Sequence, residues 1–544
     1  MITKVVNFIQ QYPYISLLVT FIGMILYQSL NLFWGFEILD SGYHLTAFQN
    51  IYDAPNTVAD NFGYYLTNLV GGAFIYIFPD MGIIHFRIIG AVCVLIAIAF
   101  IYFSLWREVP LIHLLIGLSL VVLCYVKAPY SFNNGILSCL LYVIACLILY
   151  KGINRNSSWL IFIAGIIVGI NIFTRIPNIL GIGLLLIILL HRKFIIKSDP
   201  LDWGKSFFFA FGVLMGIGFV VLLMIQLGHL GIFIDDMKIL FSSTSEKDST
   251  YSITTLILAY LNFYMTNAIS IMVFYSLFQI HNIISDKNKL LIYLFDAIAI
   301  IWLFNYVYYL DTSYRVLWGM CVVGCLMCIF RQRGILRLFS ILALYMLFVE
   351  IMGSDFALNH GCLPALLAAP VASMMIINRN RLLYLVVFVL AVMSYAVRRG
   401  NYADDGPIYA KMASINCPQA KFILTTDEKA DAINSTMKGI EPFVHPGDTL
   451  MCFPAAPMMN FLTHTYPAGG SSWPCILNGN CKFFRTIEGT PKILFNKFPS
   501  FSQSWSIGGN TLDSKFSFDI KSFILRNQYK KEFENQYFIL YVKD

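Results

Sequence analysis

The fold of this chain is decided in residues 14–48, which read YISLLVTFIGMILYQSLNLFWGFEILDSGYHLTAF. The first part, 14–33, is almost entirely apolar and has about the length that an α-helix needs to cross a bilayer. The sequence then becomes polar, with Glu37, Asp40 and His44 following closely. No small-residue cleavage site follows the apolar run, so we expect a retained membrane helix rather than a removed signal peptide.

The composition of the whole chain agrees with this start. Of its 544 residues, 58% are hydrophobic, 16% are aromatic and only 12% are charged. In soluble proteins roughly a quarter of the residues are charged, so a water-soluble chain is excluded. The high apolar content also excludes a disordered, collagen-like or coiled-coil chain. The composition therefore predicts a polytopic α-helical membrane protein.

Apolar runs long enough to span a bilayer recur along the first three quarters of the sequence. We expect about thirteen membrane-spanning helices, near residues 14–33, 83–104, 110–127, 131–150, 158–174, 177–190, 206–228, 253–279, 290–310, 315–330, 338–352, 361–377 and 381–397.

The basic residues predict the orientation of these helices. With the N-terminus in the cytoplasm, fifteen Lys and Arg residues fall in cytoplasmic joints and six in joints on the opposite side, as the positive-inside rule requires. Residues 62–78 are also apolar but are interrupted by Asn68, Gly71 and Gly72. If they spanned the membrane the charge bias would reverse, so we expect a re-entrant or interfacial helix. The first loop, about 35–82, and the tail are then both outside.

The tail, 398–544, has an ordinary globular composition and is predicted to be a separate extracytoplasmic domain beside a membrane domain, 1–397. Strands are expected at 449–453, 492–496 and 537–542, and helices at 425–438, 458–464 and 519–534, which favours an α/β layer structure. Cys475 and Cys481 flank a turn-rich spacer that could close a disulfide in an oxidising compartment.

Asp40 is the residue that best suits catalysis. It lies at the membrane surface behind the first helix, and His44 follows one helical turn later. A carboxylate there could act as a general base on an acceptor hydroxyl. Asp before Ser-Gly is also a good helix N-cap, so a structural role stays open.

Three arginines are predicted at helix ends on the same side: Arg87, Arg175 and Arg315. A guanidinium stays charged and binds phosphate with two parallel hydrogen bonds, so a lipid-linked phosphate is the natural ligand. Salt bridges to nearby acids, or snorkelling to the interface, are the alternative roles.

Other polar and aromatic residues near this face are candidates for contact with a substrate or acceptor. Aromatic belts at membrane interfaces are an equally ordinary origin for the tyrosines. Asp235 and Asp236 are adjacent in a polar loop and are expected to be solvated rather than to hold a metal. No metal ligand and no cofactor is assigned, and a divalent metal stays open. The substrate candidates are Glu37, Tyr43, His44, His85, Asp355, Asn359 and His360.

Several familiar motifs are absent. The sequence has no P-loop, no Gly-x-Gly-x-x-Gly opening a helix, no His-Glu-x-x-His and no nucleophile elbow. Nucleotide-fuelled transport and zinc proteolysis therefore lack their signatures, and no nucleic-acid partner is expected.

The arrangement resembles the GT-C superfamily of integral-membrane glycosyltransferases, the relatives of protein O-mannosyltransferases and aminoarabinose transferases. The resemblance is carried by the residues 39–44, by the segment 173–178 around Arg175, and by Gly447-Asp448 with Phe453-Pro454 and Tyr466-Pro467 in the tail. It implies that Asp40 is the first-loop acid of the family. The family often has a second acid beside it, where this chain has Ser41. Trp473 is followed by Pro474, so the Trp-Trp-Asp signature of oligosaccharyltransferases is absent.

The resemblance and the residues together predict an inverting glycosyltransferase in a bacterial cytoplasmic membrane, acting on its outer face. The donor would be a polyprenyl-phosphate-linked sugar, and the acceptor a hydroxyl of a lipid, glycan or protein. Two alternatives stay open: a transporter or flippase for a lipid-linked or small polar substrate, which would usually show internal repeats, and a glycan polymerase or ligase.

Overall fold

The structure is a computed structural model. It describes residues 8, 11–124, 131–193, 201–245, 254, 257–258, 260–265, 267–268, 289–304, 313–349, 351–353, 363–377, 404, 411–474, 489–500, 505 and 515–543.

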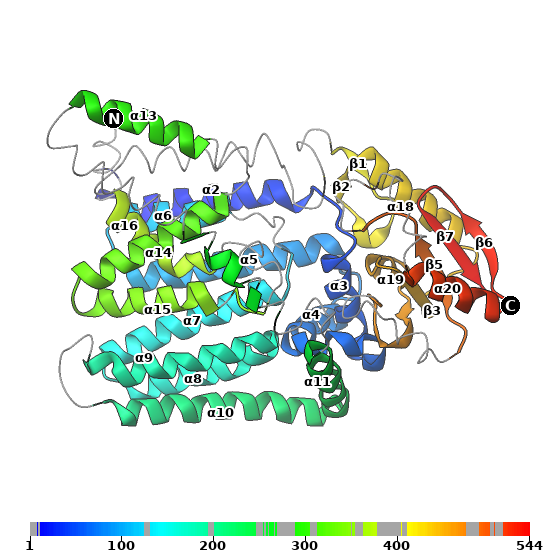
Figure 1. The fold of residues 1–544 in the computed structure, drawn as a ribbon, viewed down its shortest axis with the longest axis horizontal. Coiled ribbons are helices and arrows are strands. Elements are labelled where there is room, and N and C mark those ends of the chain that lie inside the picture. Colours follow the sequence, from blue (N-terminus) through cyan, green and yellow to red (C-terminus); the bar gives the residue numbers. More distant parts are fainter. Residues whose placement is uncertain are drawn as a thin grey trace.

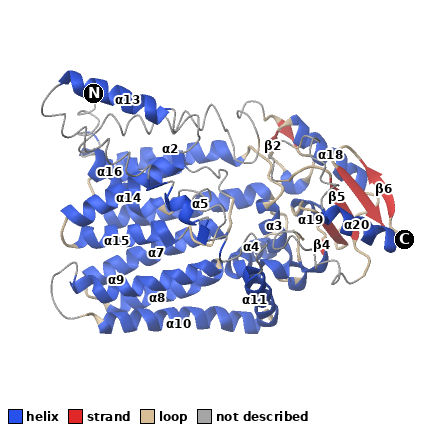
Figure 2. Ribbon diagram, in the orientation of Figure 1, coloured by secondary structure: helices blue, strands red, loops and turns tan. Residues whose placement is uncertain are grey.

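A bundle of apolar helices forms the larger part of the molecule, and a domain that contains a β-sheet lies at one end of it (Figures 1 and 2). The predicted mostly helical fold with a C-terminal α/β region is therefore confirmed at this level. The bundle helices are α2 (Pro13–Leu32), α5 (Ile83–Leu105), α6 (Leu111–Cys124), α7 (Asn134–Asn154), α8 (Ser158–Asn171), α9 (Leu184–His191), α10 (Trp203–Gln226), α14 (Ser313–Arg331), α15 (Ile335–Val349) and α16 (Ala365–Ile377). A further helix, α13 (Lys289–Phe304), is drawn above the bundle in Figure 1.

The first helix of the bundle has an exposed apolar face and a buried apolar face. On α2, one face exposes Leu18, Val19 and Ile22, while Met24 is buried against the bundle. Among the described helices, α5, α7 and α10 are long and apolar enough to cross a membrane by themselves. The expected spans at 253–279 and 381–397 lie largely or wholly outside the described residues, so the number thirteen stays a prediction.

Two of the helices pack at unusually close range. Gly165 and Gly169 on α8 face Gly212 and Gly216 on α10, and a Cβ added at any of them would lie 2.2 Å from a backbone oxygen of the other helix. Small residues four apart allow two membrane helices to approach backbone to backbone. The glycines therefore fix the contact between α8 and α10.

Four helices lie at the end of the bundle that carries the tail, which we call the loop end (Figure 1). They are α3 (Asp40–Asn50), the 3-10 helix η1 (Pro55–Tyr64), α4 (Tyr65–Ile77) and α11 (Leu230–Ser245). With 13 residues, α4 is about 20 Å long, which is shorter than the roughly 30 Å apolar core of a bilayer. As expected, residues 62–78 do not form a full membrane-spanning helix.

The opposite end of the bundle holds a cluster of charges. Asp202, before α10, accepts contacts from Arg192 Nε at 3.0 Å and from Lys205 Nζ at 3.1 Å. Both basic residues belong to the joints predicted to be cytoplasmic. The predicted orientation of the bundle in a membrane stays a prediction.

The tail contains a five-stranded sheet in the order β4-β3-β5-β7-β6. Strands β4 and β5 run parallel to β3, while β7 is antiparallel to both β5 and β6. The strands and helices of the tail are β1 (Ala413–Ser414), β2 (Leu424–Thr425), α18 (Asp427–Ile440), β3 (Thr449–Phe453), α19 (Met458–Thr463), β4 (Tyr466–Pro467), β5 (Lys492–Asn496), α20 (Lys515–Arg526), β6 (Lys530–Glu534) and β7 (Phe538–Val542).

One predicted element of the tail is wrong. The helix expected at 519–534 ends with α20 at Arg526, and Lys530–Glu534 forms the edge strand β6. Gln528 has a φ of 58° and turns the chain between the two elements. The mostly charged sequence of β6 suits an edge strand, because charges there discourage pairing with other chains.

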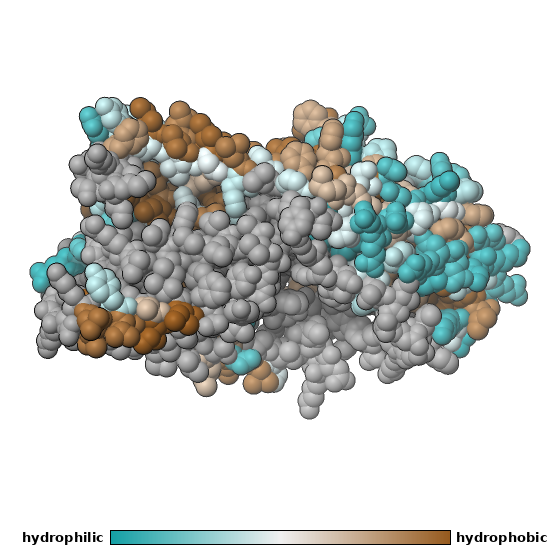
Figure 3. All heavy atoms as spheres, turned by 90° about the horizontal axis from the view of Figure 1, so that it is seen from above, coloured by the Kyte–Doolittle hydropathy of each residue, from teal (hydrophilic) through white to brown (hydrophobic). Residues whose placement is uncertain are grey.

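The tail and the first loop share one hydrophobic core. Along β3, Met451 and Phe453 pack with α20, whereas Leu450 and Cys452 face the opposite side of the sheet, as the two-residue period of a strand requires. That second face joins a continuous buried cluster that reaches Phe48 of α3. Hydrophilic residues gather on the outer surface of the tail (Figure 3). The first loop is therefore packed between the bundle and the tail.

A very close backbone contact in this core is at Gly42 of α3. A Cβ at this position would lie 2.2 Å from the backbone nitrogen of Met458 at the start of α19. The substitution Gly42→Ala is expected to lower the free energy of unfolding by about 1–3 kcal/mol, because neither backbone can move away without disturbing its neighbours. Thermal unfolding in detergent measures it, with Gly231→Ala as the control, since no atom lies within 4 Å of a Cβ there. Equal melting temperatures for the two variants would contradict the tight contact.

Candidate functional site

The start of α3 brings two carboxylates together at the loop end. Glu37 Oε1 accepts hydrogen bonds from the backbone N–H groups of Leu39 at 2.7 Å and Asp40 at 2.8 Å, and Oε2 accepts from Ser41 at 2.5 Å. Burial and the charge of Asp40 raise the pKa of the Glu37 carboxyl, against the lowering effect of the bonds from Ser41 and Leu39. Glu37 therefore caps the helix, and Asp40 is left in its first turn with a partly exposed side chain.

The sequence left two roles open for Asp40, a general base and a helix N-cap, and the structure bears on the second. The first turn of α3 is capped by the side chain of Glu37, and no side chain accepts from the turn at the N-cap residue itself. Asp40 is the first residue of the helix rather than its N-cap. A carboxylate at this position is favoured by the helix dipole.

Arg87, near the start of α5, is buried and holds the end of α2. Its Nη1 donates to the backbone oxygens of Leu32 at 2.8 Å and Trp34 at 3.3 Å, and its Nη2 donates to Gly35 at 2.5 Å. The carboxylates of Asp404 and Glu37 lie near enough to interact with its charge. The predicted phosphate contact stays a prediction, but these bonds favour a positioning role, because they fix the backbone that leads to Glu37 and Asp40.

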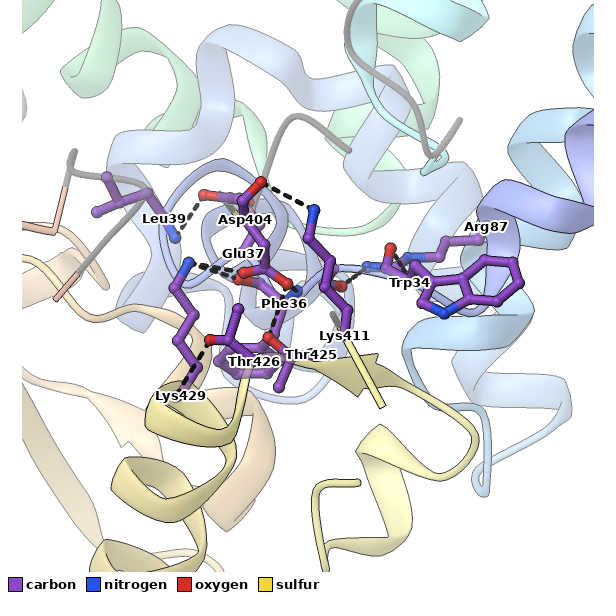
Figure 4. Close-up of polar contacts among 11 residues, drawn as sticks. Trp34, Phe36, Glu37, Leu39, Arg87, Asp404, Lys411, Thr425, Thr426 and Lys429 are labelled. Carbon is purple, nitrogen blue, oxygen red and sulfur yellow. Dashed lines mark hydrogen bonds and ion pairs between the residues drawn. The ribbon is translucent and has the colours of Figure 1, made fainter. Parts of the chain in front are cut away.

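A buried ion pair fastens the same backbone to the tail (Figure 4). Lys429 Nζ of α18 lies 2.8 Å from Asp404 Oδ1, with both side chains at most 3% exposed. Asp404 Oδ2 accepts from the backbone N–H of Phe36 at 3.2 Å and from Thr425 Oγ1 at 2.7 Å. Lys411 Nζ donates to the backbone oxygen of Asp404 at 2.9 Å.

Backbone hydrogen bonds also join the segment after α2 to β2 of the tail. The N–H of Gly35 donates to the oxygen of Leu424 at 2.7 Å, and the N–H of Leu424 donates to the oxygen of Phe33 at 2.7 Å. Residues 33–37 are therefore held by Arg87 from the bundle side and by Asp404, Lys429 and β2 from the tail side. Neither Asp404 nor Lys429 was predicted from the sequence, because a lone Asp and a lone Lys in a globular tail have no distinctive pattern.

Arg175 lies at a break between α8 and α9, where the chain forms the short 3-10 helices η2 (Ile172–Thr174) and η3 (Ile176–Gly183). Its Nη2 donates to the backbone oxygen of Met352, beyond the end of α15. Thr174 next to it accepts from Thr67 Oγ1 of α4 at 3.3 Å through its backbone oxygen. These contacts place Arg175 at the loop end.

A buried network of side-chain amide hydrogen bonds stabilises the break between α8 and α9. Asn178 Nδ2 donates to the backbone oxygen of Asn171 at 2.9 Å, to Thr174 Oγ1 at 2.8 Å and to Ser138 Oγ at 2.9 Å. Asn171 Nδ2 in turn donates to the backbone oxygen of Ser138 at 3.2 Å. A break in an apolar helix leaves backbone groups that need internal hydrogen-bond partners, so these side chains stabilise the turn that carries Arg175.

Arg315 belongs to the same end of the bundle. It lies in the first turn of α14, one helical turn before Trp318, whose Nε1 donates to the oxygen of Leu347 at 3.3 Å. Leu347 is close to the end of α15 and hence to Met352. The structure therefore brings Arg87, Arg175 and Arg315 to the end that also carries Asp40.

Some of the other predicted contact residues are described by the structure, and the rest lie outside the described residues. Tyr43 donates to the backbone oxygen of Asp60 at 2.9 Å and packs edge-on against Trp473, while His44 stacks on Phe48. His85 is exposed, and its Nδ1 accepts from the N–H of Gly82 at 2.9 Å, which caps α5. Asp355, Asn359, His360, Cys475 and Cys481 lie outside the described residues.

The structure also corrects the interpretation of the mid-chain acids. Asp235 and Asp236 lie on α11 rather than in a loop, and they point to different environments. Asp235 is exposed and pairs with Lys238 at 2.7 Å, whereas Asp236 is 6% exposed. The helical period separates the side chains of adjacent residues, so one faces solvent and the other faces η1.

Asp236 is close to a second enclosed acid, Asp60 of η1, which the sequence did not single out. Burial raises the pKa of Asp236 to about 7, against the hydrogen bond from the backbone N–H of Gly63. Burial also raises the pKa of Asp60 well above its ordinary value, and the charge of Asp236 adds to this effect while a bond from Ser471 opposes it. The two carboxyls therefore lie where α11, the first loop and the tail meet, with Asp236 on α11, Asp60 in the first loop and Ser471 in the tail.

We expect Asp236 to make the protein less stable as the pH rises. Its pKa is higher in the folded chain, about 7, than the ordinary value of 3.8. Below about pH 4 the group is protonated in both states; between about pH 4 and 7 the unfolded chain ionises first, so the folded state loses stability with rising pH. The loss is on the order of 4 kcal/mol at most and levels off above pH 7.

The substitution Asp236→Asn removes this ionisation while keeping an oxygen that can accept from Gly63. It is expected to raise the melting temperature at pH 8 and to leave it nearly unchanged at pH 4. Differential scanning fluorimetry of the detergent-solubilised chain measures both, with the exposed neighbour Asp235→Asn as the control. A variant no more stable than the parent at pH 8 would show that Asp236 is not held in an unfavourable ionised form.

Among the described residues, no group of three or more His, Cys, Asp and Glu side chains is arranged to hold a metal. The suggestion of a divalent metal stays a prediction, since Asp355 and His360 belong to the part of the chain that is not described.

Comparison with known proteins gives two similar structures. No protein-family model matches the chain, and no curated protein matches it. One structure is an oligosaccharyltransferase of Archaeoglobus fulgidus in complex with Zn and sulfate: 10% identity, TM-score 0.43, covering 85% of this chain. The chain spans 64% of that protein's length. The other is ArnT from Cupriavidus metallidurans bound to undecaprenyl phosphate: 10% identity, TM-score 0.42, covering 98% of each chain.

Both similar structures are GT-C glycosyltransferases, the superfamily that the sequence resembles. Likeness at this level of identity and TM-score assigns neither an activity nor a site residue to this chain.

Proposed function

We propose that this protein is an inverting glycosyltransferase that uses a polyprenyl-phosphate-linked sugar at the extracytoplasmic face of the membrane. The acceptor is a hydroxyl group of a lipid, glycan or protein. The support comes from the residues that the fold gathers at the loop end and from the resemblance of the sequence to the GT-C superfamily.

The observation that carries the proposal is the placement of Asp40. Its partly exposed carboxylate stands in the first turn of α3, directly after a backbone segment that is fixed from both sides by Arg87 and by the Asp404–Lys429 ion pair. A general base must be held in place within hydrogen-bond reach of the proton it removes. The anchored segment before α3 supports this role for Asp40, because it holds the carboxylate in place.

In the proposed reaction, Asp40 accepts the proton of the acceptor hydroxyl. The acceptor oxygen forms a bond to the anomeric carbon from the face opposite the phosphate, and the bond between that carbon and the phosphate oxygen breaks. The lipid phosphate leaves with the bonding electrons and carries the negative charge. Cationic groups stabilise that charge, because it develops only as the bond breaks.

Arg175 and Arg315 are the proposed partners of the leaving phosphate. Both lie at the loop end, and guanidinium groups bind phosphate with well-defined geometry. Arg87 has a different proposed role, since both of its Nη atoms bind backbone oxygens, whereas the bond to Met352 uses one Nη atom of Arg175. Arg87 positions the segment that leads to Asp40.

The proposal is tested with the full chain reconstituted in liposomes and supplied with radiolabelled polyprenyl-phosphate sugars. The expected result is release of polyprenyl phosphate together with a labelled product whose anomeric configuration is opposite to that of the donor. Release of label with retained configuration would overturn the inverting mechanism. Movement of intact donor between leaflets, with no cleavage of the sugar–phosphate bond, would instead favour the transporter alternative.

A further inference from the structure

The segment Pro418–Leu424 of the tail lies against the ends of two bundle helices. At one side, Leu424 pairs through its backbone with Phe33 and Gly35, directly after the end of α2. At the other side, a Cβ on Gly82, before α5, would lie 2.2 Å from the backbone oxygen of Gln419. Figure 1 shows β2 beside the end of α2. We call residues 418–424 the tail bridge.

Exposed apolar residues lie near this point on both helices. On α5, Ile88 and Val92 are exposed, and Phe33 is exposed directly after the end of α2. Exposed apolar side chains on a membrane-spanning helix face lipid. The tail bridge therefore lies where the lipid-facing surface of the bundle ends.

Phe422, within the tail bridge, is unusual in two ways. Its side chain is 61% exposed, although its neighbour Ile423 is fully buried. Its φ is 70°, in the left-handed region that bulky side chains rarely adopt. The other described non-glycine residues with positive φ are polar: Asn156, His464 and Gln528.

The unfavourable backbone has a consequence for the direction of the ring. A residue in the left-handed conformation costs of order 1–3 kcal/mol and persists only where its surroundings impose it. Here the pairing of Leu424 with the end of α2 and the burial of Ile423 fix the chain on one side, so the aromatic ring is turned outward. Lys421 Nζ lies 5.2 Å from the centre of this ring.

An exposed aromatic ring with an adjacent cation is suited to the headgroup region of a bilayer. Aromatic residues are enriched at membrane interfaces, and Lys places its apolar stem in the interface while its charge stays in water. Another protein would have to reach the same spot beside lipid that already surrounds α2 and α5. The continuity with these two lipid-facing helices favours lipid as the occupant.

We propose that the tail bridge is a membrane-contacting element, in which Phe422 inserts into the lipid headgroup region and Lys421 contacts lipid phosphate. The tail is thereby attached to the bilayer directly, in addition to its contacts with the first loop. This interaction is independent of any catalytic role of the loop end.

The experiment places the photo-crosslinking amino acid p-benzoylphenylalanine at position 422 of the full chain. The protein is reconstituted in nanodiscs of phosphatidylethanolamine and phosphatidylglycerol, irradiated and analysed by mass spectrometry for lipid adducts. Leu18 on the exposed face of α2 supplies the positive control, and Leu525 on α20, 78% exposed in the same tail, supplies the matched negative control.

The expected result is a lipid adduct at position 422 with a yield several-fold higher than at position 525 and closer to that at position 18. A yield at 422 no higher than at 525 would overturn the proposal. Crosslinking of 422 to a second protein chain in place of lipid would also overturn it, since the surface would then be a protein interface.

Discussion

Replacing Asp40 by Asn is expected to reduce sugar transfer by about 10²–10⁴-fold in kcat, with little change in the apparent affinity for the donor. The substitution keeps the size of the side chain and removes its ability to accept a proton. The backbone around it is held by Glu37, which caps the helix with three hydrogen bonds of its own. The folded structure of α3 is therefore expected to survive the change.

The measurement is the rate of polyprenyl phosphate release in the reconstituted system, together with the melting temperature of each protein. Asp53→Asn is the matched control, because Asp53 is an exposed acid of the same loop. The control should transfer at the parental rate. Transfer at the parental rate by the Asp40 variant itself would remove this residue from the proposed mechanism.

The second large effect concerns the ion pair between the tail and the first loop. Lys429→Ala is expected to lower the free energy of unfolding by about 3–5 kcal/mol, because Asp404 would keep a buried charge without its partner. Both side chains are at most 3% exposed, so water does not replace the lost contact. The backbone N–H of Phe36 and the hydroxyl of Thr425 would remain as donors to Asp404.

The chain offers a matched control for this experiment. Lys238 and Asp235 form an ion pair of nearly the same length, 2.7 Å, with side chains about 70% exposed. Exposed pairs contribute about 0–1 kcal/mol, so Lys238→Ala should hardly change the unfolding free energy. Limited proteolysis adds a second readout, since the Lys429 variant should be cut more readily at residues 33–37. Equal stability of the two variants would contradict the role of Lys429 as a fastener of the first loop.

Much of the architecture could be predicted from the sequence because its signals are local. The apolar runs at 14–33, 83–104 and 131–150 correspond to α2, α5 and α7, since the bilayer fixes the length and polarity of a spanning helix. In the tail, the strand predicted at 492–496 coincides with β5. The prediction failed at Lys530–Glu534, where charges at an edge strand resemble the polar face of a helix.

The candidate site was predictable only in part. Asp40 and the three arginines were selected because they stand next to apolar runs in the sequence, and this position can be read without the structure. Asp60 and Asp236 are 176 residues apart and become a pair only when α11 packs on η1. Their raised pKa values arise from burial, which the neighbouring sequence does not reveal.

The sequence by itself determined that this is a helical membrane protein with an α/β tail and that an acid follows its first helix. Hydrophobic length and two-residue or helical periods are sufficient for that, because they act over neighbouring residues. Only the tertiary structure decided that Arg87 binds backbone oxygens, that Asp404 and Lys429 fasten the tail, and that Phe422 faces outward. These facts depend on which residues, far apart in the sequence, become neighbours in the folded chain. The surroundings of a charge or a ring determine its free energy, and the local sequence does not reveal those surroundings.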